Sequence, residues 1–201
     1  MNKTIIFDLG GVLIDWNPRF VYSSYFETED AMEHFLSKVC TMEWNEEQDG
    51  GRLIQKANEI LIEKFPEYTR EILAFYNEWE TMLNGSISES VDILTSIRRQ
   101  YDKVYALTNW STETFPIAIK QFEFLSWFDG ILVSGQENLK KPDPKIYQLL
   151  LKKFNLNAEN CLFIDDNLRN VKAAIQERIP SIHFKDSNQL KEQLTLHGIE
   201  V

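Results

Sequence analysis

The sequence predicts an α/β protein with a parallel sheet and a helical segment inserted after the first strand. From residue 85 onward, short apolar runs alternate with helical patterns. Such alternation is typical of a parallel sheet with right-handed crossovers. Residues 16–84 contain no clear strand and show helical periodicity instead, which indicates a small helical bundle.

The first predicted strand is the apolar run at residues 4–7, which Asp8 and then Gly10-Gly11 follow. A short apolar run bounded by a turn signal is typical of a buried parallel strand. Asp8 then lies at the carboxyl end of the strand, the edge at which open α/β sheets bind ligands. Considered alone, an aspartate in this place is equally consistent with a simple turn.

Three helices are expected in the inserted segment. Thr28 caps the first, the second follows Gly50-Gly51 and ends near Pro66, and the third begins at about Thr69. The polar and aromatic stretch 42–52 between the first two is interpreted as a loop beside a Gly-Gly hinge. The turn residues Asn84-Gly85 are expected to close the segment. The apolar faces are expected at Met32, Phe35, Leu36 and Val39, at Leu53, Ala57, Ile60 and Leu61, and at Ile72, Tyr76, Trp79 and Leu83.

The rest of the chain is predicted to alternate between helix and strand. Residues 86–89 resemble a capping box and predict the start of a helix. Three further strands are expected to end at Thr108, Val133 and Ile164, and a last one covers 181–184. Helices are predicted at about 112–124, from Pro144, at about 168–177 and from about Ser187.

Polar residues gather after these strands. Thr108-Asn109 and Asp165-Asp166 directly follow apolar runs, and Lys141 lies shortly after another. Because parallel strands end at the same edge of a sheet, we expect these side chains to meet Asp8 there. Carboxylates, a hydroxyl, an amide and an ammonium suit a hard divalent cation and a phosphoryl group.

Four segments together resemble the four motifs of the haloacid dehalogenase superfamily. They are 7–13 (FDLGGVL), 107–109 (LTN), 141–147 (KPDPKIY) and 163–167 (FIDDN), in the family's order and across the whole chain. Together with the run DWNPR at 15–19, the residues of these motifs are similar to those of the subgroup that contains sugar-1-phosphate phosphatases and the phosphatase domain of epoxide hydrolases. The resemblance implies a Rossmann-like core of residues 1–15 and 85–201, with residues 16–84 as a helical cap.

The resemblance also implies roles for the acidic residues. Asp8 would be the nucleophile that attacks phosphorus and forms an aspartyl-phosphate. Mg²⁺ would be held by Asp8, the backbone carbonyl of Gly10, and Asp165 or Asp166, because this cation takes oxygen ligands. Asp166 is the first choice for direct ligation.

The remaining motif residues would hold the phosphate. Thr108 and Asn109 would donate hydrogen bonds to the phosphoryl oxygens. Lys141 would pair with Asp8 and the phosphate, and is preferred to Lys140 because it directly precedes Pro142, as the family's lysine does. The function implied is a Mg²⁺-dependent phosphatase acting on a small phosphorylated metabolite, such as a hexose 1-phosphate.

Gly10 departs from the family's pattern. Most phosphatases of the family carry a second aspartate here, two residues after the nucleophile, which serves as general acid and base. Such a group contributes about 10²–10⁴ in rate, or roughly 3–5 kcal/mol of barrier. Three outcomes are open: substrates with an acidic leaving group, a substitute group such as Asp15, a cap residue or metal-bound water, or a protein that binds phosphate ligands and turns over little.

A second reading of the same motifs is a 2-haloacid dehalogenase. The namesake enzymes of the family also lack the second aspartate, attack carbon and use no Mg²⁺. Paired acids at 165–166 suit a cation and would burden a metal-free site for carboxylate substrates. Mg²⁺ dependence would separate this reading from a phosphatase, and an acid-trapped phosphoenzyme would separate a phosphatase from a phosphate-binding protein.

Composition limits the partners and the location. The net charge of −10 and the lack of a basic stripe argue against nucleic acid. No run approaches the roughly 18 apolar residues of a membrane span, and Asp8 interrupts the N-terminal apolar run too early for a signal peptide. Cys40 and Cys161 are expected to be buried free thiols. We therefore expect a soluble cytoplasmic protein, a monomer or weak homodimer.

Several other residues are expected near the site or in the core. Trp44 is interpreted either as a core anchor or as part of a loop over the substrate. Arg19 and Trp110 flank the motifs, and either lining the pocket or packing elsewhere is open for both. His34, His183 and His197 match no ligand or triad spacing and are read as structural.

Overall fold

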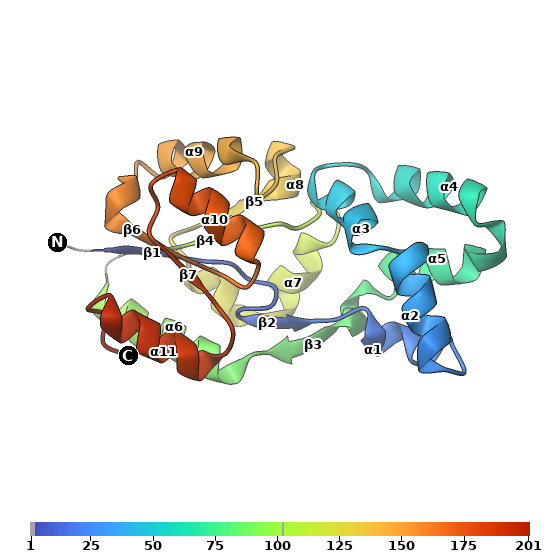
Figure 1. Cartoon of the computed structure of the whole chain (residues 1–201), viewed down its shortest axis with the longest axis horizontal. Helices are drawn as coiled ribbons and strands as arrows, with labels where there is room; N and C mark the ends of the chain where they lie inside the picture. Colours follow the sequence, from blue (N-terminus) through green and yellow to red (C-terminus); the bar gives the residue numbers. More distant parts are fainter. Residues whose placement is uncertain (1–2, 102) are drawn as a thin grey trace.

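The core of the protein is a five-stranded parallel sheet. The computed structural model describes residues 3–101 and 103–201. The strands are β1 (Thr4–Phe7), β4 (Val104–Thr108), β5 (Gly130–Val133), β6 (Cys161–Asp165) and β7 (Ser181–His183), in the order β5-β4-β1-β6-β7. The predicted α/β class and parallel sheet are thus confirmed (Figure 1).

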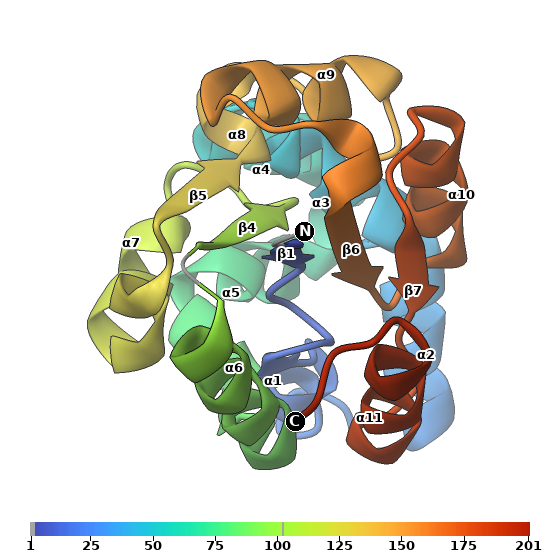
Figure 2. The ribbon, with the colours of Figure 1, turned by 90° about the vertical axis from the view of Figure 1, so that its left-hand side faces the viewer.

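Helices cover both faces of this sheet (Figure 2). They are α6 (Ser88–Gln100), α7 (Phe115–Gln121), α9 (Pro144–Lys153), α10 (Leu168–Gln176) and α11 (Ser187–Leu196). Alternation along β1 sorts the core: Ile6 packs with residues of α9 and α10, whereas Ile5 and Phe7 pack with residues of α6, α7 and α11. A strand buried on both faces must be apolar throughout, which explains its unbroken hydrophobic sequence.

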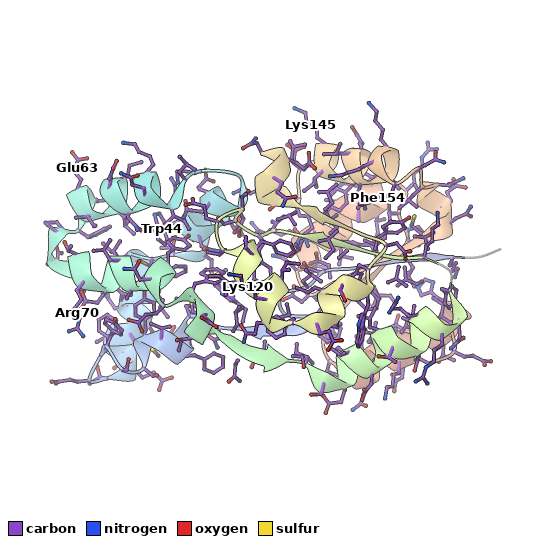
Figure 3. The ribbon with its side chains drawn as sticks, turned by 180° about the vertical axis from the view of Figure 1, so that it is seen from behind. Trp44, Glu63, Arg70, Lys120, Lys145 and Phe154 are labelled. Carbon is purple, nitrogen blue, oxygen red and sulfur yellow. The ribbon has the colours of Figure 1, made fainter. Side chains whose placement is uncertain are left out.

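The segment between β1 and α6 is mostly helical and extends away from the sheet (Figure 1). It contains α1 (Arg19–Tyr22), α2 (Glu29–Lys38), α3 (Met42–Asp49), α4 (Ile54–Lys64) and α5 (Thr69–Asn77), and a short 3₁₀ helix at Trp79–Met82. Thr28 caps α2 as predicted, because its hydroxyl accepts a hydrogen bond from the Ala31 N–H. Aromatic side chains fill this segment, with Trp44 against Phe75 and Tyr76 (Figure 3).

Some sequence-based expectations for this segment are wrong. Residues 42–49 form α3 rather than a loop, and Thr41 caps it. Leu53 and Ile60 of the second predicted face are exposed. The third predicted helix ends at Asn77, and Trp79 and Leu83 are buried beyond it.

Two short strands connect this segment to the sheet, and neither was predicted from the sequence. β2 (Ile14–Trp16) pairs antiparallel with β3 (Leu83–Ser86). Asn84-Gly85 therefore lies in a strand rather than in a closing turn. Ser86 ends β3 and does not cap α6, whose N-cap is Ile87 with no side-chain hydrogen bond, so the predicted capping box is wrong.

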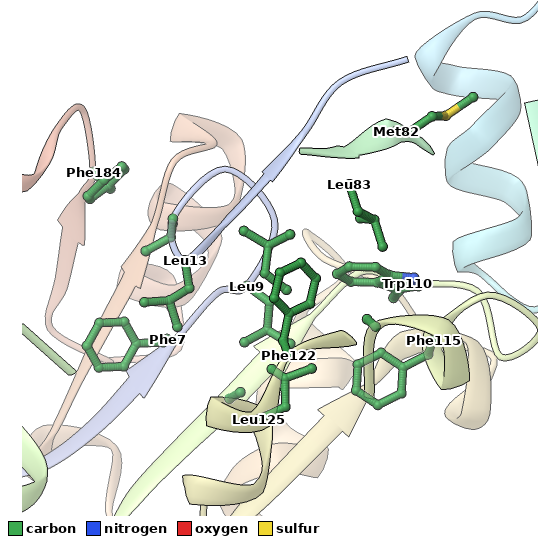
Figure 4. Packing of buried hydrophobic residues seen from close by; sticks show 14 of the residues in the cluster. Phe7, Leu9, Leu13, Met82, Leu83, Trp110, Phe115, Phe122, Leu125 and Phe184 are labelled. Carbon is green, nitrogen blue, oxygen red and sulfur yellow. The ribbon is translucent and has the colours of Figure 1, made fainter. Parts of the chain in front are cut away.

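In the core, the predicted helix at 112–124 is shorter than expected. α7 covers Phe115–Gln121, and a 3₁₀ helix follows at Glu123–Trp127. Phe122 and Leu125 from this stretch pack close to Leu9, Trp110 and Phe115 (Figure 4). The remaining strands and helices begin and end within about two residues of their predicted positions, the margin to which helix ends are defined.

Candidate active site

Three neighbouring strands bring the predicted residues to one edge of the sheet. Phe7 of β1 is in register with Ala106 of β4 and with Ile164 of β6. Asp8, Thr108 and Asp165 follow or end these strands, and the Asp8 N–H donates to the Ile164 carbonyl at 2.8 Å. The expected convergence of these side chains is confirmed.

Lys141 lies beneath this edge and joins two carboxylates. Its Nζ is 2.8 Å from Asp8 Oδ2, 2.7 Å from Asp165 Oδ2 and 3.0 Å from the Leu107 carbonyl oxygen. The side chain is completely buried. Burial alone would lower the pKa of Lys141, but Asp165 and Asp8 outweigh it and raise the pKa, so Lys141 stays charged.

Asp165 is held by a ring of hydrogen bonds and is fully buried. Besides Lys141, its carboxylate accepts from the Asn167 N–H at 2.7 Å and from Asn170 Nδ2 at 3.1 Å. The Tyr147 hydroxyl in turn donates to the Asn170 carbonyl at 2.9 Å. Such complete satisfaction fixes the carboxylate in place, and through it the Lys141 ammonium.

Asn109 binds the main chain of Lys141 through both ends of its amide. Its Nδ2 donates to the Lys141 carbonyl at 2.9 Å, and its Oδ1 accepts from the Lys141 N–H at 2.8 Å. The loop that carries Lys141 is therefore tied to the end of β4. This bracing was not foreseen from the sequence.

A tight turn follows Asp8 and positions the last acid of the cluster. The Leu13 and Ile14 N–H groups both donate to the Leu9 carbonyl. Gly11 has φ +75°, and a Cβ atom there would lie 2.3 Å from Asp166 Oδ2. Only glycine gives this backbone conformation together with room for the Asp166 carboxylate.

The three acids form a donor set for a hard cation. Asp8, Asp165 and Asp166 each offer a carboxylate oxygen, and these oxygens lie within 4.8 Å of one another. Burial raises the pKa of Asp8; Lys141 opposes this effect, and Asp165 and Asp166 add to it. Three carboxylates against one ammonium leave an excess of two negative charges, which an ion such as Mg²⁺ would neutralise.

A cavity of about 330 Å³ opens above this cluster, a size typical of small-molecule sites. The predicted residues Asp8, Gly10, Thr108, Asn109 and Asp166 line it, whereas Lys141 and Asp165 lie beneath. The other side is lined by Met42, Asn45, Glu46 and Asp49 of α3 and by Trp16, Trp79 and Trp110.

Ion pairs and a hydrogen bond hold α3 over the sheet edge. Glu46 pairs with Arg169 at 2.6 Å, and Lys140 pairs with Glu47 at 3.0 Å. The fully buried Ser134 hydroxyl donates to the Asp49 carbonyl at 2.5 Å. These contacts hold α3, which lines the cavity, against the core.

Of the other residues singled out from the sequence, some line the cavity and others lie away from it. Trp110 lines the cavity, but Arg19 does not and instead pairs with Glu33 on the surface. Trp44 packs in the helical segment. His183 Nε2 lies 3.0 Å from the Asp166 carbonyl oxygen, a structural contact.

Sequence reasoning placed the stretch 42–52 over the substrate but did not single out Asn45 or Asp49 within it, and it missed Asn170. All three are buried polar residues, and burial of polar groups in a helix is invisible to a search for apolar periodicity. For Asn170, the one available signal was its place in the first turn after Asp165-Asp166.

Comparison with known proteins identifies the family. The family model for haloacid dehalogenase-like hydrolases matches residues 2–176. The chain belongs to this family of hydrolases.

Individual relatives share about a quarter of their residues with this chain. The sesquiterpene phosphatase astK of Aspergillus oryzae is 27% identical over 92% of this chain and 91% of its own length. The "Phosphorylated carbohydrates phosphatase" of Thermotoga maritima is 24% identical over 90% of this chain and 84% of its own length.

Two solved structures confirm the fold. A haloacid dehalogenase family enzyme from Bacteroides thetaiotaomicron, the wild-type protein in complex with magnesium and inorganic phosphate, matches with a TM-score of 0.68 and 20% identity over 92% of this chain and 96% of that one. The L-2-haloacid dehalogenase of Xanthobacter autotrophicus, with chloropropionic acid covalently bound, matches with a TM-score of 0.63 and 14% identity over 100% of this chain and 85% of that one. At these identities the likeness establishes the Rossmann-like fold alone.

Within residues 3–101 and 103–201, no helix combines the length and apolar character needed to cross a membrane.

Proposed function

We propose that the protein is a Mg²⁺-dependent phosphatase that hydrolyses a small phosphorylated metabolite through an aspartyl-phosphate on Asp8. The observation that carries the proposal is the position of Asp8 at the floor of the cavity, 2.8 Å from the buried Lys141 and among two further acids. Phosphatase relatives and a fold neighbour crystallised with magnesium and phosphate support it.

Each residue of the site has a role in this proposal. Asp8 attacks phosphorus with Oδ1, which accepts a hydrogen bond from the Leu9 N–H, and its Oδ2 is held by Lys141. Thr108 donates a hydrogen bond to a phosphoryl oxygen. Lys141 neutralises charge beneath the reacting group, while Asn109 positions Lys141.

Asp8, the Gly10 carbonyl and Asp166 would hold Mg²⁺, with Asp165 directly behind them. The bound cation would offset repulsion between carboxylate and phosphate and stabilise charge on the transferred oxygens. Because Asp165 already binds Lys141, Asn167 and Asn170, Asp166 is the better choice for direct ligation.

The helical segment would act as the cap that selects the substrate, with the core at 1–15 and 85–201 and the cap at 16–84. Polar side chains of α3 line the cavity, namely Asn45, Glu46 and Asp49. Amide and carboxyl groups can hydrogen-bond to hydroxyl groups, which favours a sugar phosphate, such as a hexose 1-phosphate, over a prenyl phosphate, which has no hydroxyl groups along its chain.

A 2-haloacid dehalogenase is the alternative for the same fold. The crowding of Asp165 and Asp166 beside Asp8 argues against it, since a metal-free site for an anionic substrate would gain only repulsion from these acids.

The buried free thiols of Cys40 and Cys161 are typical of a protein in a reducing compartment, which supports a cytoplasmic location.

Phosphate release from a panel of sugar, acyl, prenyl and aryl phosphates, with Mg²⁺ and with chelator, tests the proposal. We expect release that requires Mg²⁺ and favours a sugar phosphate. Release that is unaffected by chelator, or halide release from a 2-haloacid without phosphate release, would contradict it.

A further inference from the structure

The proposed phosphatase reaction lacks a general acid in the family's usual place. Gly10 has no side chain there to protonate the leaving oxygen. The sequence suggested Asp15, a cap residue or metal-bound water as a substitute. Asp15 lies outside the cavity lining, and its side chain accepts a hydrogen bond from Asn84 Nδ2 at 2.9 Å. The cap residues that line the cavity are the remaining side-chain candidates.

Asp49, the last residue of α3, lies in the wall that faces Asp8. It is 6% exposed and lines the same cavity as Asp8 and Thr108. The Ser134 hydroxyl binds its backbone carbonyl and also accepts from the Trp110 N–H at 2.9 Å. Asp49 is thereby fixed to the loop that follows Thr108, where the phosphoryl group would bind.

A hydrogen-bond chain within the helical segment orients the Asp49 carboxyl. Asn45 Nδ2 donates to Asp49 Oδ2 at 3.3 Å, and Asn45 Oδ1 accepts from the Tyr76 hydroxyl at 2.9 Å. Gln48 Nε2 donates to the same hydroxyl at 2.7 Å. Asp49 is thus held from the helical segment and by the Ser111 backbone N–H, and it lines the cavity.

Charge distinguishes Asp49 from Glu46, the other acid of α3 in the cavity wall. Glu46 is ion-paired with Arg169 and lies 3.8 Å from Lys140, which assigns it to holding α3 in place. Asp49 has no ion pair within the described part of the chain. The groups that act on it are Glu46, Lys140, Lys141 and the Ser111 backbone N–H, but burial dominates and raises the pKa of Asp49 to about 7.

We propose that Asp49 is the general acid and base of the reaction and supplies from the cap the carboxyl that Gly10 lacks. In the first step, an Asp8 oxygen bonds to phosphorus, the bond from phosphorus to the leaving oxygen breaks, and the Asp49 proton passes to that oxygen. In the second step, the Asp49 carboxylate takes a proton from water as the water oxygen bonds to phosphorus, and the bond from phosphorus to the Asp8 oxygen breaks. Inorganic phosphate leaves, and Asp8 and the protonated Asp49 are restored.

This inference rests on the proposed phosphatase activity. One set of rate measurements tests the role of Asp49 separately from that activity. Single-turnover formation of the phosphoenzyme is measured for the wild type, Asp49→Asn and Glu46→Gln over aryl phosphates of graded leaving-group acidity and a hexose 1-phosphate. We expect Asp49→Asn to lose about 10²–10⁴ in rate on the poorest leaving groups and little on the best. Glu46→Gln should change all substrates by a similar factor, as expected for a residue that holds α3.

An equal loss in Asp49→Asn across the series, or none, would overturn the role of Asp49 while leaving the phosphatase proposal intact. The absence of any wild-type phosphoenzyme would overturn both. Binding of inorganic phosphate to Asp49→Asn verifies that the variant is folded.

The wild type alone provides an independent test that needs no folded variant. Its phosphorylation rate on a poor leaving group should fall as the pH rises through about 7, because Asp49 loses its proton. Its rate on the best leaving group should not show this fall. The same pH profile for both substrates would contradict the assignment.

Discussion

Lys141 and Asp165 form a completely buried ion pair, with Lys141 Nζ 2.7 Å from Asp165 Oδ2. The same ammonium lies 2.8 Å from Asp8, so one cation links the residue proposed as nucleophile to the best-braced acid of the site. An intact buried ion pair contributes little net stability. Removing one of its partners costs much more, because the other partner is left as an unpaired buried charge.

Replacing Lys141 should therefore destabilise the protein strongly. Lys141→Met leaves both Asp8 and Asp165 without their cation, and we expect a loss of about 3–5 kcal/mol in the free energy of unfolding. Urea unfolding measures this. Lys140→Met is the matched control: its surface ion pair with Glu47 should contribute no more than ~1 kcal/mol. Equal losses in the free energy of unfolding of the two variants would show that removing Lys141 from the buried pair costs no more than breaking a surface ion pair.

Gly11 should be irreplaceable for a reason that the turn alone does not explain. Gly11→Ala places a methyl group 2.3 Å from Asp166 Oδ2 at a φ of +75°. We expect a stability loss of about 1–3 kcal/mol from backbone strain and a weaker response of activity to Mg²⁺, because Asp166 is displaced. Gly198→Ala has nearly the same φ, +74°, with no atom near the added Cβ, and should show the strain without the metal effect. Identical Mg²⁺ titrations of the two variants would count against Asp166 as a ligand.

The vacant acid–base position can be refilled. A Cβ atom at Gly10 meets nothing within 4 Å, so Gly10→Asp should fold normally and increase activity on poor leaving groups relative to good ones. It should also restore part of the activity lost in Asp49→Asn, by up to about 10²-fold on poor leaving groups, the lower end of what a general acid contributes. Steady-state rates over a leaving-group series decide this. Uniform changes across the series would argue that a proton donor does not limit the reaction.

The pH dependence of stability should reveal the buried carboxyl. Burial raises the pKa of Asp49 from 3.8 to about 7, so between these values the native state binds a proton that the unfolded state lacks. Stability from the neutral carboxyl is fully present below pH 3.8 and is lost as the pH rises to about 7. At about 1.4 kcal/mol per pKa unit, the total is on the order of 4 kcal/mol.

Asp49→Asn lacks this titration. The free energy of unfolding of Asp49→Asn relative to the wild type should increase between about pH 5 and about pH 8, as measured by urea unfolding. Parallel pH curves for the two proteins would mean that Asp49 is ionised in the native state throughout this range.

Most of the core fold followed from local sequence, because strands buried on both faces and helices with one apolar face have distinct periods. The helical segment was predicted less accurately from its sequence. α3 buries Asn45, Gln48 and Asp49, so it carries no apolar stripe to find. β2 and β3 are three and four residues long and are defined by their pairing with each other, which is a tertiary relationship.

The same distinction applies to the site. Asp8, Thr108 and Asp165 were foreseen because the carboxyl ends of parallel strands meet at one edge of the sheet. Asp49 and Trp79 reach the cavity only because the helical segment folds back over the sheet edge. No rule of spacing relates them to Asp8.

The most direct test of the account is to look for phosphate on Asp8 during turnover. Wild-type protein is mixed with Mg²⁺ and a hexose 1-phosphate, quenched in acid, digested and analysed by mass spectrometry, with Asp8→Asn as the control. The account predicts one phosphoryl group on the peptide that contains Asp8, and none in Asp8→Asn. Release of inorganic phosphate by Asp8→Asn at the wild-type rate, or a phosphoryl group trapped on another residue, would contradict it.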